Sequence, residues 1–404
     1  MSEYRIERLG HHGDGIADGP IFAPRTLPGE IVAGEVDGHR IRAPKIVKPS
    51  EHRRKAPCVH YGSCGGCALQ HATDEFVSSW KLDLVRTALE NRGISAELET
   101  IHTSPAQTRR RAVLHGRRFK SGPQVGFFAR QSDQLVAVPN CLLLTPRILA
   151  CLPALERIVD CAGSRRGTMS LAVIDTGKGL DLAISGGHPL DLALRQSLSG
   201  ALVEGMFLRV SYDDEVIAMS EQPAMAMGRA AVVTPAGAFL QATREGEAAL
   251  VSAMRRATEG ADRIADLFCG CGTFALPLAE TAEVHGVESE ADMLVALDGG
   301  WRGSAGLHRV STEKRDLFRR PLMADELKAY DAVVLDPPRP GAEAQCIELA
   351  GSSVGRVGMV SCNPVTFARD IAILVEGGFN LDWVEVVDQF RWSTHVEISA
   401  GLSR

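Results

Sequence analysis

The strongest constraint on the fold is a series of short apolar segments that alternate with helical patterns after about residue 236. Four of these segments are predicted to be strands: residues 263–268, 283–288, 332–336 and 356–361. Fully apolar strands separated by helices are typical of a parallel sheet that is covered on both faces. The sequence therefore predicts an α/β domain of this kind over residues 236–404.

A glycine-rich loop follows the first of these strands, in the sequence DLFCGCGT at residues 266–273. Glycines at this point let the backbone approach a ligand at the carboxyl edge of the sheet. The next strand ends in Glu288, which is placed to accept the two hydroxyls of a ribose. Asp316 and Asp336 follow at later strand ends, where they are predicted to contact the adenine and methionine sides of a cofactor.

The same loop indicates which cofactor fits. It lacks the third glycine of a dinucleotide fingerprint, and it lacks the Lys-Ser/Thr pair that binds a triphosphate. An adenosine cofactor without phosphates fits best, and S-adenosylmethionine is the commonest. Asp336 opens the sequence DPPR, which resembles the DPP-aromatic motif of amino-methyltransferases. Arg339 replaces the aromatic residue, which argues against N-methylation of adenine.

Cys362 and Glu397 are the candidate catalytic residues. Cys362 follows a predicted strand at the cofactor edge, although most cysteines at strand ends are buried small hydrophobic residues. C5 of uracil is a poor nucleophile, and addition of a thiolate to C6 activates it. A base must then remove the C5 proton. Glu397, on the last predicted strand, is the candidate base, and the target nucleotide must be flipped out of its stack.

Three closely spaced cysteines, Cys58, Cys64 and Cys67, predict a metal centre near the N-terminus. Thiolates at this spacing favour a metal, and the spacing alone leaves zinc and an iron–sulfur cluster open. Reduced free thiols are the alternative. The candidates for a fourth ligand are Cys141, Cys151 and Cys161.

The N-terminal part has a different pattern, with short strand-like runs between glycines and prolines in residues 1–50. This pattern favours a small β-barrel, a fold that often binds single-stranded nucleic acid. The net charge of the chain is −6, yet two stretches are strongly basic. The first spans residues 40–55, and the second, residues 101–130, contains no acid and includes Phe119, Phe127 and Phe128. Local patches of this kind favour RNA contact, with a solvated basic surface as the alternative.

Taken together, the motifs resemble the RNA (uracil-5)-methyltransferase family, and within it the 23S ribosomal RNA branch. The matching segments are residues 13–15 and 26–30, 58–71, 239–241, 266–273, 336–341, 361–364 with 368–370, and 395–397. The resemblance implies a TRAM-like barrel over residues 1–54 and a mixed α+β middle domain over residues 55–235. It also implies a class I, Rossmann-like S-adenosylmethionine-dependent domain over residues 236–404.

The resemblance also assigns roles to individual residues. Cys362 is the nucleophile and Glu397 the base. The implied cofactor-binding residues are Gln241, Phe268, Thr273, Glu288, Asp316 and Asp336. A four-iron, four-sulfur cluster is implied on Cys58, Cys64, Cys67 and Cys141. One departure stands out, because the family usually has a proline where this chain has Arg391.

Other functions remain open at this stage. They are methylation of transfer RNA, C5 methylation of cytosine, a catalytically silent RNA-binding protein and an iron–sulfur redox protein. The presence of nucleophile, base and cofactor acids together argues against the silent protein. No apolar run approaches the length of a membrane span, and the first residues have no apolar signal core. We expect a cytoplasmic monomer, and the resemblance implies 23S ribosomal RNA as its partner.

Overall fold

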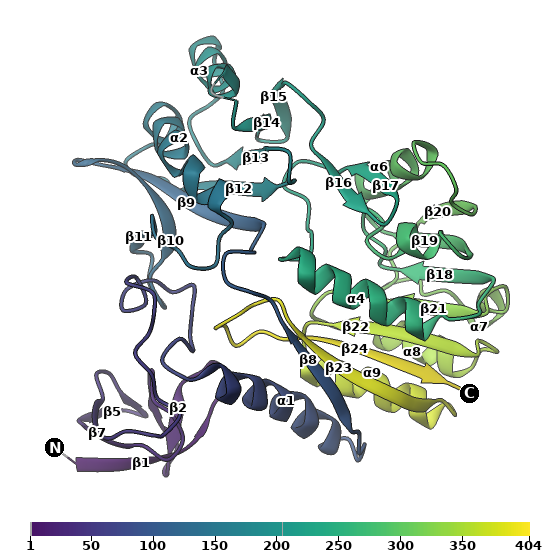
Figure 1. Ribbon diagram of the computed structural model, residues 1–404, viewed down its shortest axis with the longest axis horizontal. Helices are drawn as coiled ribbons and strands as arrows, with labels where there is room; N and C mark the ends of the chain where they lie inside the picture. The colour runs from purple at the N-terminus through teal and green to yellow at the C-terminus, as the bar shows by residue number, and fades with distance from the viewer. Residues whose placement is uncertain (1, 204) are drawn as a thin grey trace.

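The structure is a computed structural model that describes residues 2–203 and 205–404. Within these residues the strands form three large sheets and one two-stranded hairpin. Figure 1 shows the N-terminal sheet at one end of the molecule, near the start of helix α1, and the C-terminal sheet with its helices at the other. In the same described ranges, no helix is both long enough and apolar enough to cross a membrane.

The N-terminal sheet consists of seven short strands. They are β1 (Ser2–Leu9), β2 (Gly15–Ala17), β3 (Ile21–Ala23), β4 (Ile31–Gly34), β5 (Val36–Asp37), β6 (Arg40–Ile41) and β7 (Lys45–Lys48). Strand β1 pairs with β2 on one side and β4 on the other, and its register shifts between Ile6 and Arg8. Such a shift bends a strand, so the sheet curls around a small core that includes Ile6 and Val32. This agrees with the predicted small β fold.

The middle sheet also has seven strands, in the order β11-β10-β9-β12-β13-β14-β15. They are β9 (Arg111–Phe119), β10 (Gly122–Phe128), β11 (Leu135–Ala137), β12 (Met169–Asp175), β13 (Leu180–Ser185), β14 (Phe207–Tyr212) and β15 (Glu215–Met219). Helices α2 (Pro146–Ala162) and α3 (Leu192–Val203) pack on it. Alternate residues of β9, such as Ala112 and Leu114, are buried in the core shared with α2, as the two-residue period of a strand requires.

The C-terminal sheet has eight strands in the order β20-β19-β18-β21-β22-β24-β23-β8. They are β8 (Leu98–Thr103), β18 (Arg263–Leu267), β19 (Glu283–Glu288), β20 (Val310–Lys314), β21 (Ala332–Leu335), β22 (Arg356–Ser361), β23 (Asn380–Asp388) and β24 (Glu397–Ser403). Strands β18 to β22 are parallel, as predicted, whereas β24 is antiparallel to both of its neighbours. Because no helix separates β23 from β24, the chain reverses between them and the pair must be antiparallel.

Helices cover both faces of this sheet, as the apolar strands predict. They are α1 (Asp74–Glu90), α4 (Arg244–Ala257), α5 (Ala275–Leu278), α6 (Ala291–Arg302), α7 (Ala324–Leu327), α8 (Glu343–Ala350) and α9 (Pro364–Glu376). One core includes residues of α1, α8 and α9, and another includes residues of α4, α5 and α6. The hairpin of β16 (Ala224–Met227) and β17 (Ala230–Val233) packs on α6. The strand order reverses at β18, and in open α/β sheets a ligand crevice lies at such a point, beyond the carboxyl ends of the strands.

The Thr73 hydroxyl accepts a hydrogen bond from the Phe76 N–H at 3.3 Å and caps the first turn of helix α1. Its buried residues Val85 and Leu89 belong to the core of the C-terminal sheet. Strand β8 pairs with β23 at the edge of the same sheet. Residues 74–103 thus join the C-terminal sheet, although they fall within the predicted middle segment. The predicted domain boundaries stay a prediction.

Candidate active site and cysteine segment

One cavity of about 1000 Å³ connects residues 58–71, which we call the cysteine segment, with the carboxyl edge of the C-terminal sheet. Every residue for which the sequence predicts a role lies in its wall. These residues are Cys58, Cys64, Cys67, Cys141, Gln241, Phe268, Thr273, Glu288, Asp316, Asp336, Cys362 and Glu397. The fold therefore brings together positions that are more than 300 residues apart in the sequence, while their individual roles remain predictions.

The glycine-rich loop after β18 has a backbone that few residue types adopt. Phe268, Gly270 and Gly272 all have positive φ, at 63°, 53° and 99°. A Cβ atom on Gly272 would lie 3.0 Å from the side chains of Leu276 and Leu297, so only glycine fits without displacing them. The Gly270 N–H donates to Glu288 at 3.1 Å, which joins the loop to the strand-end acid.

The chemistry of this edge fits an adenosine cofactor that carries a positive charge. Asp266 is fully buried, and no described side chain hydrogen-bonds to its carboxylate, which lies near the Ala275 backbone N–H. Burial, together with the nearby charges of Asp336 and Glu288, holds the pKa of Asp266 well above its usual range. Burial also raises the pKa of Asp336 to about 7. Several carboxyl groups that cannot all ionise easily are suited to a cationic ligand.

Cys362 and Glu397 lie beside each other at the cavity end of two paired strands. Ser361 on β22 is paired with Ile398 on β24, so Cys362 and Glu397 occupy the next matching positions. Burial, with the charge of Asp336, raises the pKa of Glu397 to about 8. Burial, with the charge of Glu397, raises the pKa of Cys362 to about 11, and Arg339 opposes both shifts. The cavity wall thus contains, close together, the Cys362 thiol, the Glu397 carboxyl group with its raised pKa, and the Arg339 cation.

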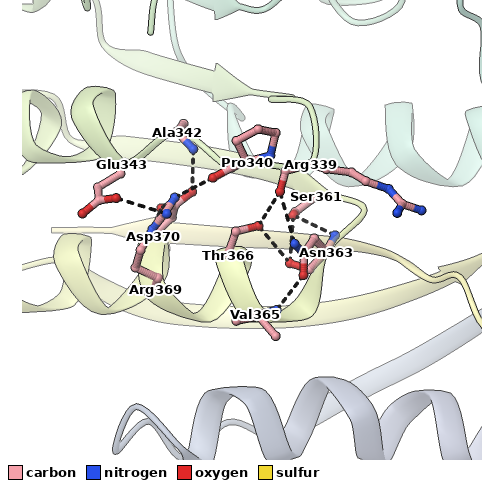
Figure 2. Close-up of polar contacts among 10 residues, drawn as sticks. All are labelled: Arg339, Pro340, Ala342, Glu343, Ser361, Asn363, Val365, Thr366, Arg369 and Asp370. Atoms are coloured by element: carbon pink, nitrogen blue, oxygen red, sulfur yellow. Dashed lines mark hydrogen bonds and ion pairs between the residues drawn. The ribbon is translucent and has the colours of Figure 1, made fainter. Parts of the chain in front are cut away.

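The loop that carries Arg339 is tied to the start of α9 (Figure 2). The backbone oxygen of Arg339 accepts hydrogen bonds from Asn363 at 3.2 Å and Thr366 at 3.1 Å. Arg369 donates to the backbone oxygen of Pro340, and Figure 2 shows the Arg339 guanidinium extending away from these contacts. At Gly341 (φ 79°) a Cβ atom would lie 2.5 Å from Arg369 and Asp370. These contacts hold the segment of residues 336–341 against the segments of residues 361–364 and 368–370.

Two residues of the site were not assigned a role from the sequence. The Gln389 amide nitrogen donates to Gln241 at 2.6 Å, its oxygen accepts from the Ala242 N–H at 2.7 Å, and it hydrogen-bonds to Glu397, which lowers the pKa of that carboxyl group. His395 accepts a hydrogen bond from Arg339 at 3.1 Å through Nδ1, because a guanidinium can only donate. His395 belongs to the matching segment 395–397, whereas no motif named from the sequence contains Gln389.

The four predicted ligand cysteines share one end of the cavity. Burial raises the pKa of Cys67 to about 12, and the charges of Cys141, Cys64 and Cys58 add to the shift, so the four thiols are close enough to interact. Of the three candidates for the fourth ligand, Cys141 lies in the cavity wall, while Cys151 is buried in α2 and Cys161 is exposed near its end. Within residues 2–203 and 205–404, no group of three or more His, Cys, Asp or Glu side chains is arranged to hold a single metal ion.

Three of the seven positive charges in the second basic stretch, residues 101–130, are paired with acids from other segments. Arg110 is buried and pairs with Glu247, Arg130 pairs with Asp14 at 2.7 Å, and Arg118 pairs with Asp160 at 3.2 Å. Phe127 lies in the cavity wall, and Phe128 stacks on His115 with 4.1 Å between ring centroids. The number of positive charges in the sequence thus overstates the charge that this stretch presents to a partner.

Comparisons with known proteins identify the family. Residues 303–404 match the family model described as tRNA (Uracil-5-)-methyltransferase. An RNA methyltransferase of Brucella suis is 44% identical over 402 residues, which cover 99% of this chain and 97% of the relative. The 23S rRNA (uracil(1939)-C(5))-methyltransferase RlmD of Chromohalobacter salexigens is 30% identical, with coverage of 99% and 88%.

A solved structure shows the same fold over the whole chain. It is the tRNA (uracil-54, C5)-methyltransferase of Pyrococcus abyssi in complex with S-adenosyl-L-homocysteine, with a TM-score of 0.76, 20% sequence identity and 99% of both chains covered. At this identity the likeness concerns the fold. The sequence relatives and the family model carry the assignment: the chain belongs to the RNA (uracil-5)-methyltransferase family and is an S-adenosylmethionine-dependent RNA methyltransferase.

Proposed function

We propose that this enzyme methylates C5 of a specific uridine in 23S ribosomal RNA, with Cys362 as nucleophile and Glu397 as base. The observation that carries the proposal is the position of these two side chains at the ends of β22 and β24, in the cavity that also contains the cofactor edge. A thiol and a base that face the same ligand are what activation of a uracil ring requires.

The reaction balances with the groups at hand. The Cys362 thiolate adds to C6 of the uracil, a C–S bond forms, and the ring becomes an enolate that is nucleophilic at C5. S-adenosylmethionine, when bound, would supply the methyl group to C5 and would leave as S-adenosylhomocysteine. Glu397 takes the C5 proton, the C5–C6 double bond re-forms, and the C–S bond breaks to return the thiolate. The raised pKa of Glu397 makes it a stronger base once it is ionised.

The proposed cofactor-binding residues surround the carboxyl edge of the sheet. Gln241, Phe268 and Thr273 would contact the cofactor, Glu288 would bind the ribose, and Asp316 and Asp336 would flank the adenine and methionine ends. Phe268 and Phe318, with ring centroids 5.4 Å apart, provide an apolar wall beside Asp316. Isothermal titration of the purified protein with S-adenosylhomocysteine, with and without Glu288→Gln, measures this role directly.

The substrate branch is tested by mass spectrometry of nucleosides from ribosomal and transfer RNA, prepared separately from cells with and without the gene. We expect 5-methyluridine to disappear from large-subunit ribosomal RNA alone. Its loss from transfer RNA would keep the chemistry and move the substrate to the transfer RNA branch. Loss of 5-methylcytosine would identify cytosine as the target, and an unchanged set of methylated nucleosides would favour a catalytically silent RNA-binding protein.

We also propose that Cys58, Cys64, Cys67 and Cys141 hold a four-iron, four-sulfur cluster. In such a cluster each sulfur ligand binds a different iron, so the thiols stand farther apart than the ligands of one ion. The proposal is supported by the position of all four cysteines in the wall of one cavity, where the charges of Cys141, Cys64 and Cys58 affect the pKa of Cys67. The cluster would hold the segment in place next to the RNA. Iron and sulfide analysis of protein purified without oxygen tests the assignment.

The remaining proposals concern the rest of the chain. The curled N-terminal sheet of residues 1–54 and the middle segment of residues 55–235 would bind RNA beside the cavity, and residues 236–404 would form the catalytic domain. We expect the enzyme to act as a cytoplasmic monomer. Gel filtration with light scattering, and RNA binding by a chain with charge-reversed Arg42 and Lys45, test the oligomeric state and the first RNA surface.

A further inference from the structure

Residues 389–396, which we call the β23–β24 loop, join the end of β23 at Asp388 to the start of β24 at Glu397. The loop forms neither helix nor strand. Its conformation therefore depends on contacts with other parts of the chain. A change in that conformation would displace the carboxylate of Glu397, which directly follows the loop. The contacts of Trp392 and Arg391 come from the N-terminal half of the sequence, including the cysteine segment and the first residue of α1.

Trp392 is the central residue of the loop. Its side chain is buried, and its φ of 59° lies in the left-handed region that non-glycine residues rarely adopt. The Trp392 backbone oxygen accepts hydrogen bonds from the N–H groups of Ala68 at 2.8 Å and Leu69 at 2.9 Å. Ala68 directly follows the predicted ligand Cys67. A strained backbone persists only where its surroundings enforce it, and here the cysteine segment is part of those surroundings.

Asp74, the first residue of α1, holds the side chains of the same loop. One carboxylate oxygen accepts from the Trp392 indole N–H at 3.1 Å and from Arg54 at 2.9 Å. The other accepts from Arg391 at 2.8 Å. The Arg391 guanidinium also lies over the Trp392 ring, 4.9 Å from its centroid. Asp74 thus fixes two consecutive loop residues to the start of a helix.

The resemblance noted from the sequence implies a proline in related chains at the position where this chain has Arg391. A proline restrains the loop by fixing φ. The Arg391 N–H donates no backbone hydrogen bond in the described part of the chain, so a proline there would remove none. The ion pair with Asp74 restrains the loop through a side chain instead.

We propose that Trp392 and Arg391 are positioning residues for Glu397, held by Asp74 and by the backbone of residues 68–69. The position of the catalytic base then depends on the conformation of the cysteine segment. The inference rests on the proposed role of Glu397. It predicts that a disturbance of the segment at residues 64–72 slows turnover without touching the cofactor acids.

The test compares three variants of the full-length enzyme. Trp392→Phe removes the indole N–H and keeps a ring, and Asp74→Asn removes the charge and keeps the size. Asp83→Asn is the matched control, because Asp83 lies on the same helix, is exposed and pairs with Arg86. The measurements are kcat and KM for RNA, the Kd for S-adenosylhomocysteine, and hydrogen exchange of peptides covering residues 64–72 and 389–397.

We expect kcat to fall at least about tenfold in Trp392→Phe and Asp74→Asn, because a small displacement of a catalytic group is costly. The Kd for S-adenosylhomocysteine should match that of Asp83→Asn, and exchange should rise in both peptides together. Unchanged kcat, or a lower kcat with unchanged exchange in either peptide, would overturn the inference. If the wild-type enzyme and Asp83→Asn both fail to form 5-methyluridine, it is the proposed function that fails.

A second pair of variants covers the case in which Asp74→Asn or Trp392→Phe does not fold. Arg391→Ala removes the tether, whereas Arg391→Pro replaces it with a backbone restraint. We expect Arg391→Ala to lose kcat and Arg391→Pro to retain most of it. Equal kcat in the two variants would contradict a positioning role for Arg391.

Discussion

Cys362 and Glu397 lie across the ends of two paired strands, where burial and the charge of Glu397 raise the pKa of the Cys362 thiol. The thiolate and the carboxylate are therefore disfavoured together in the free enzyme, because like charges at a buried site oppose each other. Arg339 lowers the pKa of both groups and partly offsets this repulsion. The pair thus gains its reactive form most easily when positive charge is near.

Replacement of the thiol should stop the reaction before the first covalent step. In Cys362→Ala we expect no detectable 5-methyluridine formation and a Kd for S-adenosylhomocysteine within about twofold of the wild type, because the side chain acts on the substrate. Single-turnover assays with radiolabelled methyl donor measure 5-methyluridine formation, and titration calorimetry measures the Kd for S-adenosylhomocysteine. Cys161→Ala, at an exposed cysteine, is the control. Full activity in Cys362→Ala would refute the mechanism.

Replacement of the base should stop the reaction after methyl transfer. In Glu397→Gln the C5 proton cannot be removed, so the C–S bond cannot break and a covalent protein–RNA adduct should accumulate. Denaturing gels with labelled RNA detect the adduct, and the double variant Cys362→Ala/Glu397→Gln should show none. Rapid turnover without an adduct in Glu397→Gln would assign the base to another residue.

The raised pKa of Glu397 predicts how rate and stability depend on pH. The value of kcat/KM should increase as pH rises through about 8, because the base must be ionised to accept a proton. Stability should change in the opposite direction. The folded protein keeps a proton that the unfolded chain, with a carboxyl pKa of 4.5, has released, so the free energy of unfolding falls as pH rises from 4.5 to about 8. Urea unfolding of Glu397→Gln should show a shallower fall.

A buried ion pair at the edge of the C-terminal sheet predicts a large loss of stability. Lys81 on α1 is fully buried and donates to Asp388 at 2.5 Å. Lys81→Met would leave the Asp388 carboxylate buried without its partner, which costs about 3–5 kcal/mol. The double variant Lys81→Met/Asp388→Asn should recover part of the loss. Chemical denaturation measures the free energy of unfolding of the wild type, Lys81→Met and the double variant. A loss below about 1 kcal/mol in Lys81→Met would show that the ion pair contributes little to stability.

The proposed cluster predicts a difference between cysteines that look alike in the sequence. Cys64→Ser should lose iron and the visible absorbance of the purified protein, because it removes one of four ligands. Cys161→Ser should keep both, since Cys161 lies near the end of α2 and outside the cavity wall. Equal iron content in the two variants would contradict the proposed ligand set.

The sequence predicted the fold class and the main site residues because the signals are local. Apolar strands with helices between them, the glycine loop and the strand-end acids are all short patterns, and parallel strands bring their carboxyl ends to one edge. The antiparallel end of the sheet was harder to predict, because periodicity does not reveal strand direction. The pairing of β8 with β23 joins residues nearly 300 positions apart, which no local pattern indicates.

Some features of the site were decided only by the tertiary structure. His395 belongs to a motif recognised in the sequence and Gln389 does not, and their partners Arg339 and Gln241 come from other elements. The basic stretch at residues 101–130 was visible in the sequence, whereas the acids that neutralise part of it come from elsewhere in the chain.

By itself the sequence determined which chemical groups are available and at which strand ends they stand, because residue type and hydrophobic period are properties of the chain. The tertiary structure alone decided which of those groups meet, how buried they are and hence how their pKa values shift. It also decided that the β23–β24 loop rests on Asp74 and on the backbone of residues 68–69. These contacts arise from the packing of distant segments, and burial and electrostatic coupling depend on that packing.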